Sequence, residues 1–595
     1  MYNFKVASQA ELQAEVLAGF TNGMNVVDDD SQLSADTPRL QVNARRAHDG
    51  RLRVRHGCEL AADLSAEFDD IIGIEYFSGY LIVVNADGRI AACTEDGDWN
   101  IIWSEFIANG LSGSPHGWGG CSFISFAQFK ETLIICNGID KPVAVDAALI
   151  VSYVADPATG SNVNVPRAAY VVASQNYCLY AGDPFDPTIL YITSKGTSNV
   201  FQGDAGSDGT NIDMGVYVRL GSAVIRGLSP FRGNVVIGFD KQYVVATLGV
   251  YVSADHRPSF SDTIENYGLL NQSCIVASGD DVIFADIMGI STLTRTIFTG
   301  LIQPSKLSRN IEPIIVPQLA SLSDNILATW PFMVYNGRDT EFILYAPNLP
   351  DNREVYETTG YVLSADREKR VNAWAIYKGM MWSCGCTTRL QRLYYARAGY
   401  IFRMGSDAQP IRRDHEGWEE MFSDDTTFTD GRGFATTDPA ATYKHGVSIE
   451  FDYISTWFTM GRRRNMKKTK YFGIETDGEA RFTVEHFVDS IFFKRNDFGE
   501  PFTDDTIFSD GMGWAYETPP YDPALSMEFV GGEAYGFGGS PYGDAYGDGR
   551  ITNDERLFAW TVKGNRHKLR VHGYAIEGLG ISSMSLLYRT GSIRR

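Results

Sequence analysis

The middle of the chain repeats one short pattern, and this repeat strongly limits how the chain can fold. Each copy is an apolar, strand-like run followed by a turn rich in Gly, Asn or Asp and then a second run. Seven runs begin at Tyr80, Thr132, Asn176, Asn234, Asp281, Met333 and Leu393, so successive starts lie 52, 44, 58, 47, 52 and 60 residues apart. A four-stranded blade of a β-propeller takes roughly 40–50 residues, and radial stacking covers both faces of each blade. We therefore predict an all-β protein with a β-propeller of six or seven blades. A long two-sheet sandwich is the alternative.

Length and composition agree with this fold. A chain of 595 residues can hold two or three domains. Its 59 glycines, 44% apolar residues and 12% aromatic residues are typical of strands joined by tight turns. We expect an N-terminal arm and docking segment over 1–60, the propeller over 61–415 and a further β-rich domain over 416–595. Residues 1–20 also have the pattern of a mildly amphipathic helix.

An internal duplication predicts the organisation of the C-terminal domain. Residues 421–434 (MFSDDTTFTDGRGF) recur at 501–514 (PFTDDTIFSDGMGW), 80 residues later. A Trp, a basic segment and a Gly/Ala-Ile-Glu sequence also recur, at 456–475 and 559–577. We therefore expect two copies of one β-rich module, which form either a platform or a tip.

A Gly/Tyr-rich loop is predicted over 531–550. Tyr535, Tyr542 and Tyr546 supply contact area with a polar tip, which suits a contact between subunits or a channel gate. A surface loop without such a role explains the composition equally well.

Each copy of the duplicated motif carries an acidic turn, and these turns are weak candidates for a metal site. The carboxylates are Asp424, Asp425 and Asp430 in the first copy and Asp504, Asp505 and Asp510 in the second. Calcium prefers several carboxylate and carbonyl oxygens on a turn. A hairpin with an Asp-Gly turn between aromatic residues explains the same sequence, and we favour the hairpin. We predict no cofactor and no catalytic residue.

A basic segment stands out in this acidic chain. It contains Arg462, Arg463, Arg464, Lys467, Lys468 and Lys470. Three interpretations remain open: docking on an acidic surface of a neighbouring protein, a solvated edge strand protected by Lys, and a contact with DNA phosphates.

The net charge of -21 argues against a protein that grips DNA by neutralising phosphates. It is compatible with a conduit, because weak attraction along the wall lets DNA slide. No apolar run reaches the roughly 18–20 residues of a membrane span, and no signal peptide is recognisable, so we expect no membrane insertion. The eight cysteines lack metal-site spacing and are expected to be buried, reduced thiols.

Several short motifs carry a resemblance to a known family. They are Gly19–Asn25, Arg39–Asn43, Asp49–Gly57, Asn137–Pro142, Leu179–Gly182, Leu190–Ser194, Ile225–Leu228, Gly268–Cys274 and Ala373–Tyr377. In this order they resemble the packaged-DNA stabilisation and tail nozzle proteins of short-tailed bacteriophages, similar to tail tubular protein B. The resemblance covers residues 19–405, and the order of the motifs carries it.

The resemblance implies a structural protein of the virion tail, assembled in the bacterial host cytoplasm. It implies a homohexameric nozzle or hub ring below the tail adaptor, possessing a propeller in each subunit. Such a ring extends the portal channel, retains packaged double-stranded DNA without reading its sequence, and conducts it during ejection. Tail fibre or needle proteins are further expected partners.

Two other functions are less favoured. A propeller at the tail tip could bind a host glycan through exposed aromatic residues such as Trp118. A glycan-degrading enzyme would need a pair of positioned carboxylates, and neither the acidic turns nor the nine histidines show catalytic spacing. We therefore expect no enzymatic activity and no small-molecule substrate.

Overall fold

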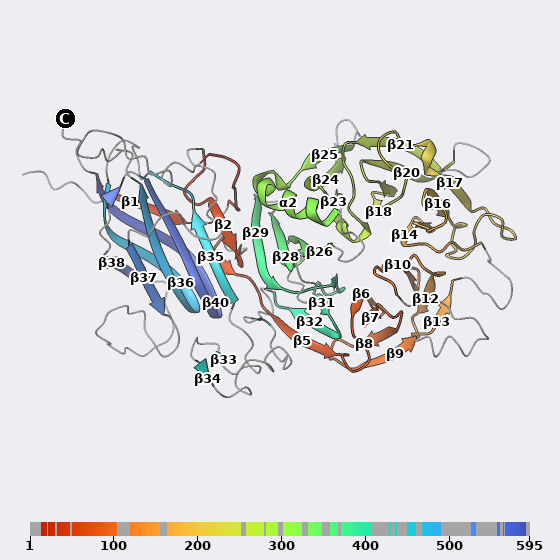
Figure 1. The fold of residues 1–595 in the computed structure, drawn as a ribbon, viewed down its shortest axis with the longest axis horizontal. Coiled ribbons are helices and arrows are strands. Elements are labelled where there is room, and N and C mark those ends of the chain that lie inside the picture. Colours follow the sequence, from red (N-terminus) through yellow and green to blue (C-terminus); the bar gives the residue numbers. More distant parts are fainter. Residues whose placement is uncertain are drawn as a thin grey trace, which may run out of the picture. The chain divides into compact units, whose positions relative to one another are not determined.

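A computed structural model gives the fold of the chain (Figure 1). It describes residues 13–18, 20, 22–29, 32–47, 50–103, 120–154, 164–251, 258–278, 281–295, 302–323, 331–347, 358–366, 371–406, 411, 414, 428–429, 435–436, 449–459, 467–489, 525–530, 556–559, 563–564 and 566–590. The chain forms two compact units. Unit 1 comprises residues 1–59, 362–378 and 405–595, and unit 2 comprises residues 60–361 and 379–404. The chain passes between the units near residues 59, 361, 378 and 404, so residues 362–378 of the expected propeller range cluster with unit 1.

Four-stranded antiparallel sheets follow one another along unit 2. Blade 1 is β6 (Ile71–Phe77), β7 (Tyr80–Asn85), β8 (Ile90–Cys93) and β9 (Trp99–Trp103); blade 2 is β10 (Ser125–Phe129), β11 (Thr132–Cys136), β12 (Val143–Asp146) and β13 (Val151–Tyr153); blade 3 is β14 (Tyr170–Ser174), β15 (Tyr177–Ala181), β16 (Ile189–Ile192) and β17 (Thr210–Asp213). Blade 4 is β18 (Gly227–Phe231), β19 (Asn234–Gly238), β20 (Gln242–Tyr251) and β21 (Pro258–Glu265); blade 5 is β22 (Ile275–Ser278), β23 (Asp281–Asp286), β24 (Gly289–Arg295) and β25 (Ile302–Lys306).

The last two blades include segments that also belong to unit 1. Blade 6 is β26 (Phe332–Asn336), β27 (Glu341–Pro347), β28 (Thr358–Asp366) and β29 (Val371–Met380), and residues 362–378 of its outer strands cluster with unit 1. Blade 7 is β30 (Cys384–Thr387), β31 (Leu393–Arg397), β32 (Tyr400–Met404) and, as its outer strand, β5 (Cys58–Asp63) from near the N-terminus. The helical elements η1 (Met214–Val216), η2 (Gln272–Cys274), η3 (Ser308–Ile311) and α2 (Glu312–Ser323) lie between strands.

The sheets close into a ring. The first strands of successive blades, β6, β10, β14, β18, β22, β26 and β30, each contact the next, and β30 contacts β6 (Figure 1). The predicted all-β fold with a β-propeller is therefore confirmed, and the propeller has seven blades. Each of the seven sequence runs falls in a different blade, at or near the start of its first or second strand.

Apolar side chains between neighbouring blades hold the ring together. One core lies between blades 1 and 2 around Ile82 and Ile135, and another lies between blades 3 and 4 around Leu190 and Val235. The strands are apolar on both faces because each sheet is covered on both sides. A similar core, which contains Val83 of blade 1, joins it to blade 7 and so closes the ring.

Polar contacts reinforce the closure between blades 7 and 1. Arg392, before β31, pairs with Glu95, after β8, and these side chains are only 24% and 20% exposed. Trp99 of β9 donates its indole N–H to the carbonyl of Asp63 at 2.8 Å. A Cβ on Gly97 would lie 2.6 Å from the Ala61 carbonyl oxygen, so this turn requires glycine.

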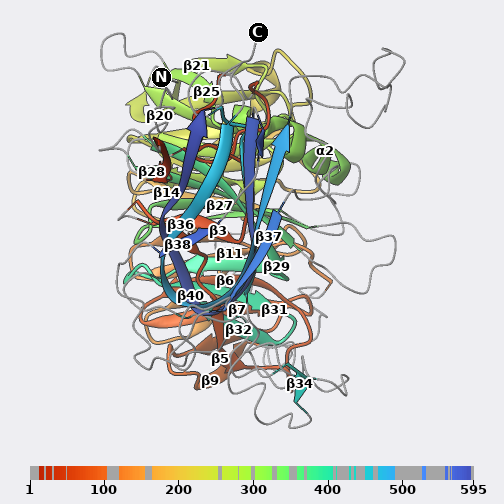
Figure 2. The ribbon, with the colours of Figure 1, turned by 90° about the vertical axis from the view of Figure 1, so that its left-hand side faces the viewer.

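Unit 1 is a β-sheet assembly drawn from both ends of the chain (Figure 2). Its strands are β1 (Gln13–Ala18), β2 (Pro38–Val42), β3 (Ala44–Arg46), β4 (Leu52–Val54), β33 (Phe428–Thr429), β34 (Ala435–Thr436), β35 (Ile449–Ser455), β36 (Lys467–Asp489), β37 (Leu525–Val530), β38 (Arg556–Ala559), β39 (Lys563–Gly564) and β40 (Arg566–Thr590), together with residues 362–378 of β28 and β29. The long strands β36 and β40 pair antiparallel along almost their whole length (Figure 2).

The predicted duplication explains the pairing of β36 and β40. Each carries one copy of the Gly/Ala-Ile-Glu sequence, and Asp477 and Gly478 pair with Gly580 and Leu579 at the centre of the ladder. The two copies are thus related by an approximate two-fold axis. β37 pairs with the C-terminal part of β36, and β1 pairs with the C-terminal part of β40.

The predicted N-terminal helix is wrong for residues 13–18. These residues form β1, whose six residues pair in register with Ser583–Tyr588 of β40. Leu17 is buried in the apolar core of unit 1, whereas Val16 is 56% exposed. A non-local ladder of hydrogen bonds has overridden the weak helical pattern.

Candidate functional site

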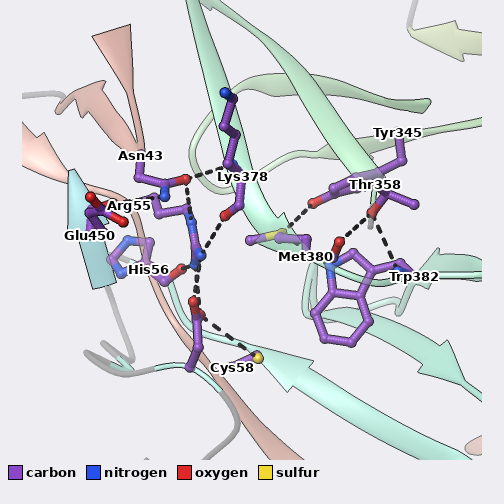
Figure 3. Close-up of polar contacts among 11 residues, drawn as sticks. Asn43, Arg55, His56, Cys58, Tyr345, Thr358, Lys378, Met380, Trp382 and Glu450 are labelled. Carbon is purple, nitrogen blue, oxygen red and sulfur yellow. Dashed lines mark hydrogen bonds and ion pairs between the residues drawn. The ribbon is translucent and has the colours of Figure 1, made fainter. Parts of the chain in front are cut away.

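Asn43, between β2 and β3, is the centre of a buried polar junction within unit 1 (Figure 3). Its side-chain oxygen accepts hydrogen bonds from Lys378 N at 2.8 Å and Arg55 Nε at 2.9 Å. Its Nδ2 donates to the Glu450 carbonyl at 2.8 Å. The backbone at Asn43 has φ of 51°, a conformation that Asn tolerates better than most residues. One amide thus joins β2, the segment before β5, β29 and β35.

Arg55 and Asp414 form a buried ion pair in the same junction. Arg55 Nη1 donates to Asp414 Oδ1 at 2.7 Å, and Nη2 donates to the other carboxylate oxygen. The two side chains are 1% and 11% exposed. The guanidinium also donates to the carbonyl of Lys378 at 3.2 Å and lies 5.9 Å from the ring centroid of Tyr377. A two-pronged pair of this kind fixes geometry as well as charge.

A close backbone approach completes the junction. Met24 N donates to the Trp374 carbonyl at 2.8 Å. A Cβ on Gly23 would lie 1.9 Å from the Trp374 backbone nitrogen, so no other residue fits without displacing β29. The segments 22–25, 39–43 and 50–57 therefore meet residues 373–378, although more than 300 residues separate them in sequence. These donors and acceptors bond to one another within the junction, which therefore acts as a structural lock.

The residues of the basic segment differ in how far they are exposed. Lys467, at the start of β36, is fully buried, and burial lowers the pKa of its ammonium group while Glu15 of β1 raises it. Lys467 therefore belongs to the interior of the sheet, and its predicted role in docking a partner is wrong. Lys468 is exposed and Lys470 is half-buried. Arg462, Arg463 and Arg464 lie outside the described residues.

The predicted acidic turns are only partly described. In the first copy, Phe428 and Thr429 pair antiparallel with Thr436 and Ala435, as the hairpin interpretation predicts. Asp424, Asp425, Asp430, Asp504, Asp505 and Asp510 lie outside the described residues, as do Trp118 and the loop tyrosines Tyr535, Tyr542 and Tyr546. Within the described ranges, no group of three or more His, Cys, Asp or Glu side chains is arranged to hold a metal ion.

The outer face of the C-terminal sheet holds a charged cluster that sequence reasoning missed. Arg570 of β40 donates to Asp452 of β35 at 2.8 Å and to Glu485 of β36 at 3.4 Å. Alternation of charged and apolar residues along 568–571 was the available signal, because the charged positions are the less buried ones. Nearby, Arg566 and Lys568 lie 5.5 and 5.7 Å from the ring of Trp457.

A histidine pair lies on the opposite, inner side of the same strands. His486 Nε2 and His567 Nδ1 are 2.9 Å apart, and both side chains are fully buried. Burial, and then the neighbouring His567, hold the pKa of His486 well below its ordinary value. The fold therefore favours the neutral form of His486.

Buried titratable groups also occur in the propeller. All eight cysteines are buried and none forms a disulfide, as predicted, and burial raises the pKa of Cys121 to about 11. These thiols are consequently poor nucleophiles. Burial raises the pKa of Glu75, on β6, to about 7.

Comparisons with known proteins find β-propellers among solved structures and assign no family. No known family and no curated protein matches the chain. Among solved structures, YCF48 bound to a D1 peptide is 10% identical with a TM-score of 0.34, covering 59% of this chain and 96% of that one. The Swd1 propeller domain of Myceliophteria thermophila is 8% identical with a TM-score of 0.34, covering 56% and 96%. BamB from Moraxella catarrhalis is 11% identical with a TM-score of 0.31, covering 59% and 99%. The propeller assignment consequently depends on the strand pairing described above. No helix among the described residues is long and apolar enough to cross a membrane.

Proposed function

We propose that this protein is a structural subunit of a short-tailed bacteriophage tail, the nozzle or hub ring below the tail adaptor. Six copies surround a passage that continues the portal channel. The ring helps retain packaged DNA and conducts it during ejection. The subunit acts mechanically and catalyses no reaction.

The observation that supports this proposal is the convergence of the resembling motifs. Gly23, Asn43, Arg55 and Trp374 come from four of these motifs, and all four residues make contacts within the junction. Motifs whose residues contact one another in the same buried junction have a common physical reason to occur together. Their joint occurrence in this order therefore supports the resemblance more than any motif does alone.

The charge of the chain supports the expected relationship to DNA. With a net charge of -21, the chain offers few unpaired cations to bind phosphates, which suits a passage along which DNA slides. The exposed Lys468 is a candidate contact for an acidic surface of the adaptor or of a fibre or needle protein.

The proposal is tested by assembling phage particles without this protein. We expect heads that carry portal and adaptor but lack the density below the adaptor, and that lose packaged DNA. Addition of purified protein should restore that density. Particles that keep a complete tail and its DNA without this chain would exclude the nozzle role. Loss of fibres or of host binding alone would favour the tail-tip receptor function.

A glycan-degrading activity is tested separately. Purified protein is incubated with capsular polysaccharide or lipopolysaccharide, and the release of reducing ends is measured. We expect none. Release that requires a particular carboxylate would replace the mechanical function with an enzymatic one.

A further inference from the structure

Exposed large apolar residues gather at one end of the propeller. In an antiparallel blade, the turn from the second to the third strand and the link to the next blade lie at the same end. Seven exposed apolar residues of blades 2, 3 and 5 and of the link from blade 3 to blade 4 lie in these segments: Ile139, Phe185, Val216, Leu220, Val224, Ile287 and Met288. We call this set the apolar face. The opposite turns hold only Ile150 and Leu390 among the described residues of this kind.

The same turn presents an apolar side chain in three blades. Asn137, Asp183 and Asp286 end or follow the second strands of blades 2, 3 and 5. Each accepts a hydrogen bond from the backbone N–H two residues later, at 3.0, 2.9 and 2.8 Å. The donors are Ile139, Phe185 and Met288, whose side chains are 37%, 73% and 52% exposed. These side chains are thus displayed by ordered turns.

In blade 3 a backbone hydrogen bond joins two segments of the apolar face. Ile225 N donates to the Pro187 carbonyl at 3.1 Å, which holds the turn of Phe185 against the link that carries Val216 and Val224. Val216 is 80% exposed. A patch of ordered apolar side chains on a soluble protein marks an interaction surface.

The charge around the apolar face indicates what covers it. Acidic and basic residues alternate there: Asp140 with Lys141, Asp186 with Arg167, Asp213 with Arg219, and Asp240 with Lys241. This balance does not suit DNA, which requires an excess of cations. A chain with a net charge of -21 repels its own copies, so copies approach at least electrostatic cost where the charges are balanced and can pair across the contact.

We propose that the apolar face is covered by a second copy of this chain, and that it forms one side of the contact between neighbouring subunits. The inference rests on the proposed ring and names the surface that builds it. In a ring, each copy offers this face to a different surface of the next copy, because head-to-tail contacts close into rings.

The test compares two double variants with the wild-type full-length protein by mass photometry and negative-stain imaging. Phe185→Asp with Val216→Asp places two charges on the apolar face. Ile150→Asp with Leu390→Asp is the matched control, because these residues are 64% and 55% exposed at the opposite end of the blades. All four side chains are exposed, so each variant should melt as the wild type does.

We expect the wild type and the control to form rings, and the apolar-face variant to associate about tenfold or more weakly. If the wild type and the apolar-face variant form rings equally well, the apolar face is not the contact between subunits, although the proposed ring is correct. If the control fails as the variant does, the location of the contact is wrong. A wild type that stays monomeric at all concentrations excludes both the ring and the contact.

Discussion

Replacing Asp414 with Ala should strongly destabilise unit 1. The substitution leaves the Arg55 guanidinium, only 1% exposed, without the carboxylate that accepts two of its hydrogen bonds. Breaking a buried ion pair from one side costs about 3–5 kcal/mol. Arg55 keeps its hydrogen bonds to Asn43 and to the carbonyls of His56 and Lys378, so we expect the lower end, about 3 kcal/mol.

The control removes the acidic partner of an exposed pair. Arg89 and Glu67 are 38% and 51% exposed, so Glu67→Ala should cost less than about 1 kcal/mol. The Arg55→Met and Asp414→Leu double variant should be less destabilised than the sum of the single variants, because no charge is left buried alone.

Hydrogen exchange with mass spectrometry is the assay, since it reports local stability. In Asp414→Ala, peptides from β2, β4 and β29 should exchange faster, while those from blades 2–4 should not change. An Asp414→Ala variant no less stable than Glu67→Ala, with unchanged exchange in β2 and β29, would refute the assignment of the junction as a lock.

Three further perturbations follow from the same contacts. Burial raises the pKa of Glu75 from 4.5 to about 7, so its stabilising contribution is complete below pH 4.5 and is lost as the pH rises through 7. In urea unfolding at pH 8, Glu75→Gln should raise the free energy of unfolding by about 2–3 kcal/mol. No gain at pH 8 would contradict this reasoning. The pKa of His486 is lowered from 6.5, so the stability that it contributes is present above pH 6.5 and decreases as the pH falls below 6.5. Calorimetry should show that the His486→Leu variant loses less stability than the wild type between pH 7 and pH 5. Equal losses would count against the buried histidine pair. Arg392→Ala removes the ion pair with Glu95, so it should lower the free energy of unfolding by about 1 kcal/mol and speed hydrogen exchange in β5 and β6. A change confined to blades 3 and 4 would show that this pair does not hold blades 7 and 1 together.

The sequence reveals the blades but not how they close. The runs beginning at Tyr80, Thr132 and Asn234 coincide with β7, β11 and β19, because local apolar patterning is sufficient to define a strand. The outer strand of blade 7 comes from residues 58–63, more than 300 residues from β32. No local pattern reports such a pairing.

The buried polar junction could not be predicted from local sequence patterns either. Arg55 and Asp414 lie 359 residues apart, and neither belongs to a recognisable chemical motif. Asn43 and Trp374 were found only as parts of separate resembling motifs. The helical pattern of residues 13–18 was misleading because β40 offers these residues an edge to pair with. In each case a non-local partner determined the structure.

The most direct test of the proposed ring is the mass and symmetry of the purified protein. Six copies of a 65.9 kDa chain weigh about 395 kDa. Native mass spectrometry with electron microscopy should therefore give a particle of that mass with six-fold symmetry and a central hole. A 65.9 kDa monomer at all concentrations, or a closed particle without a passage, would contradict the account.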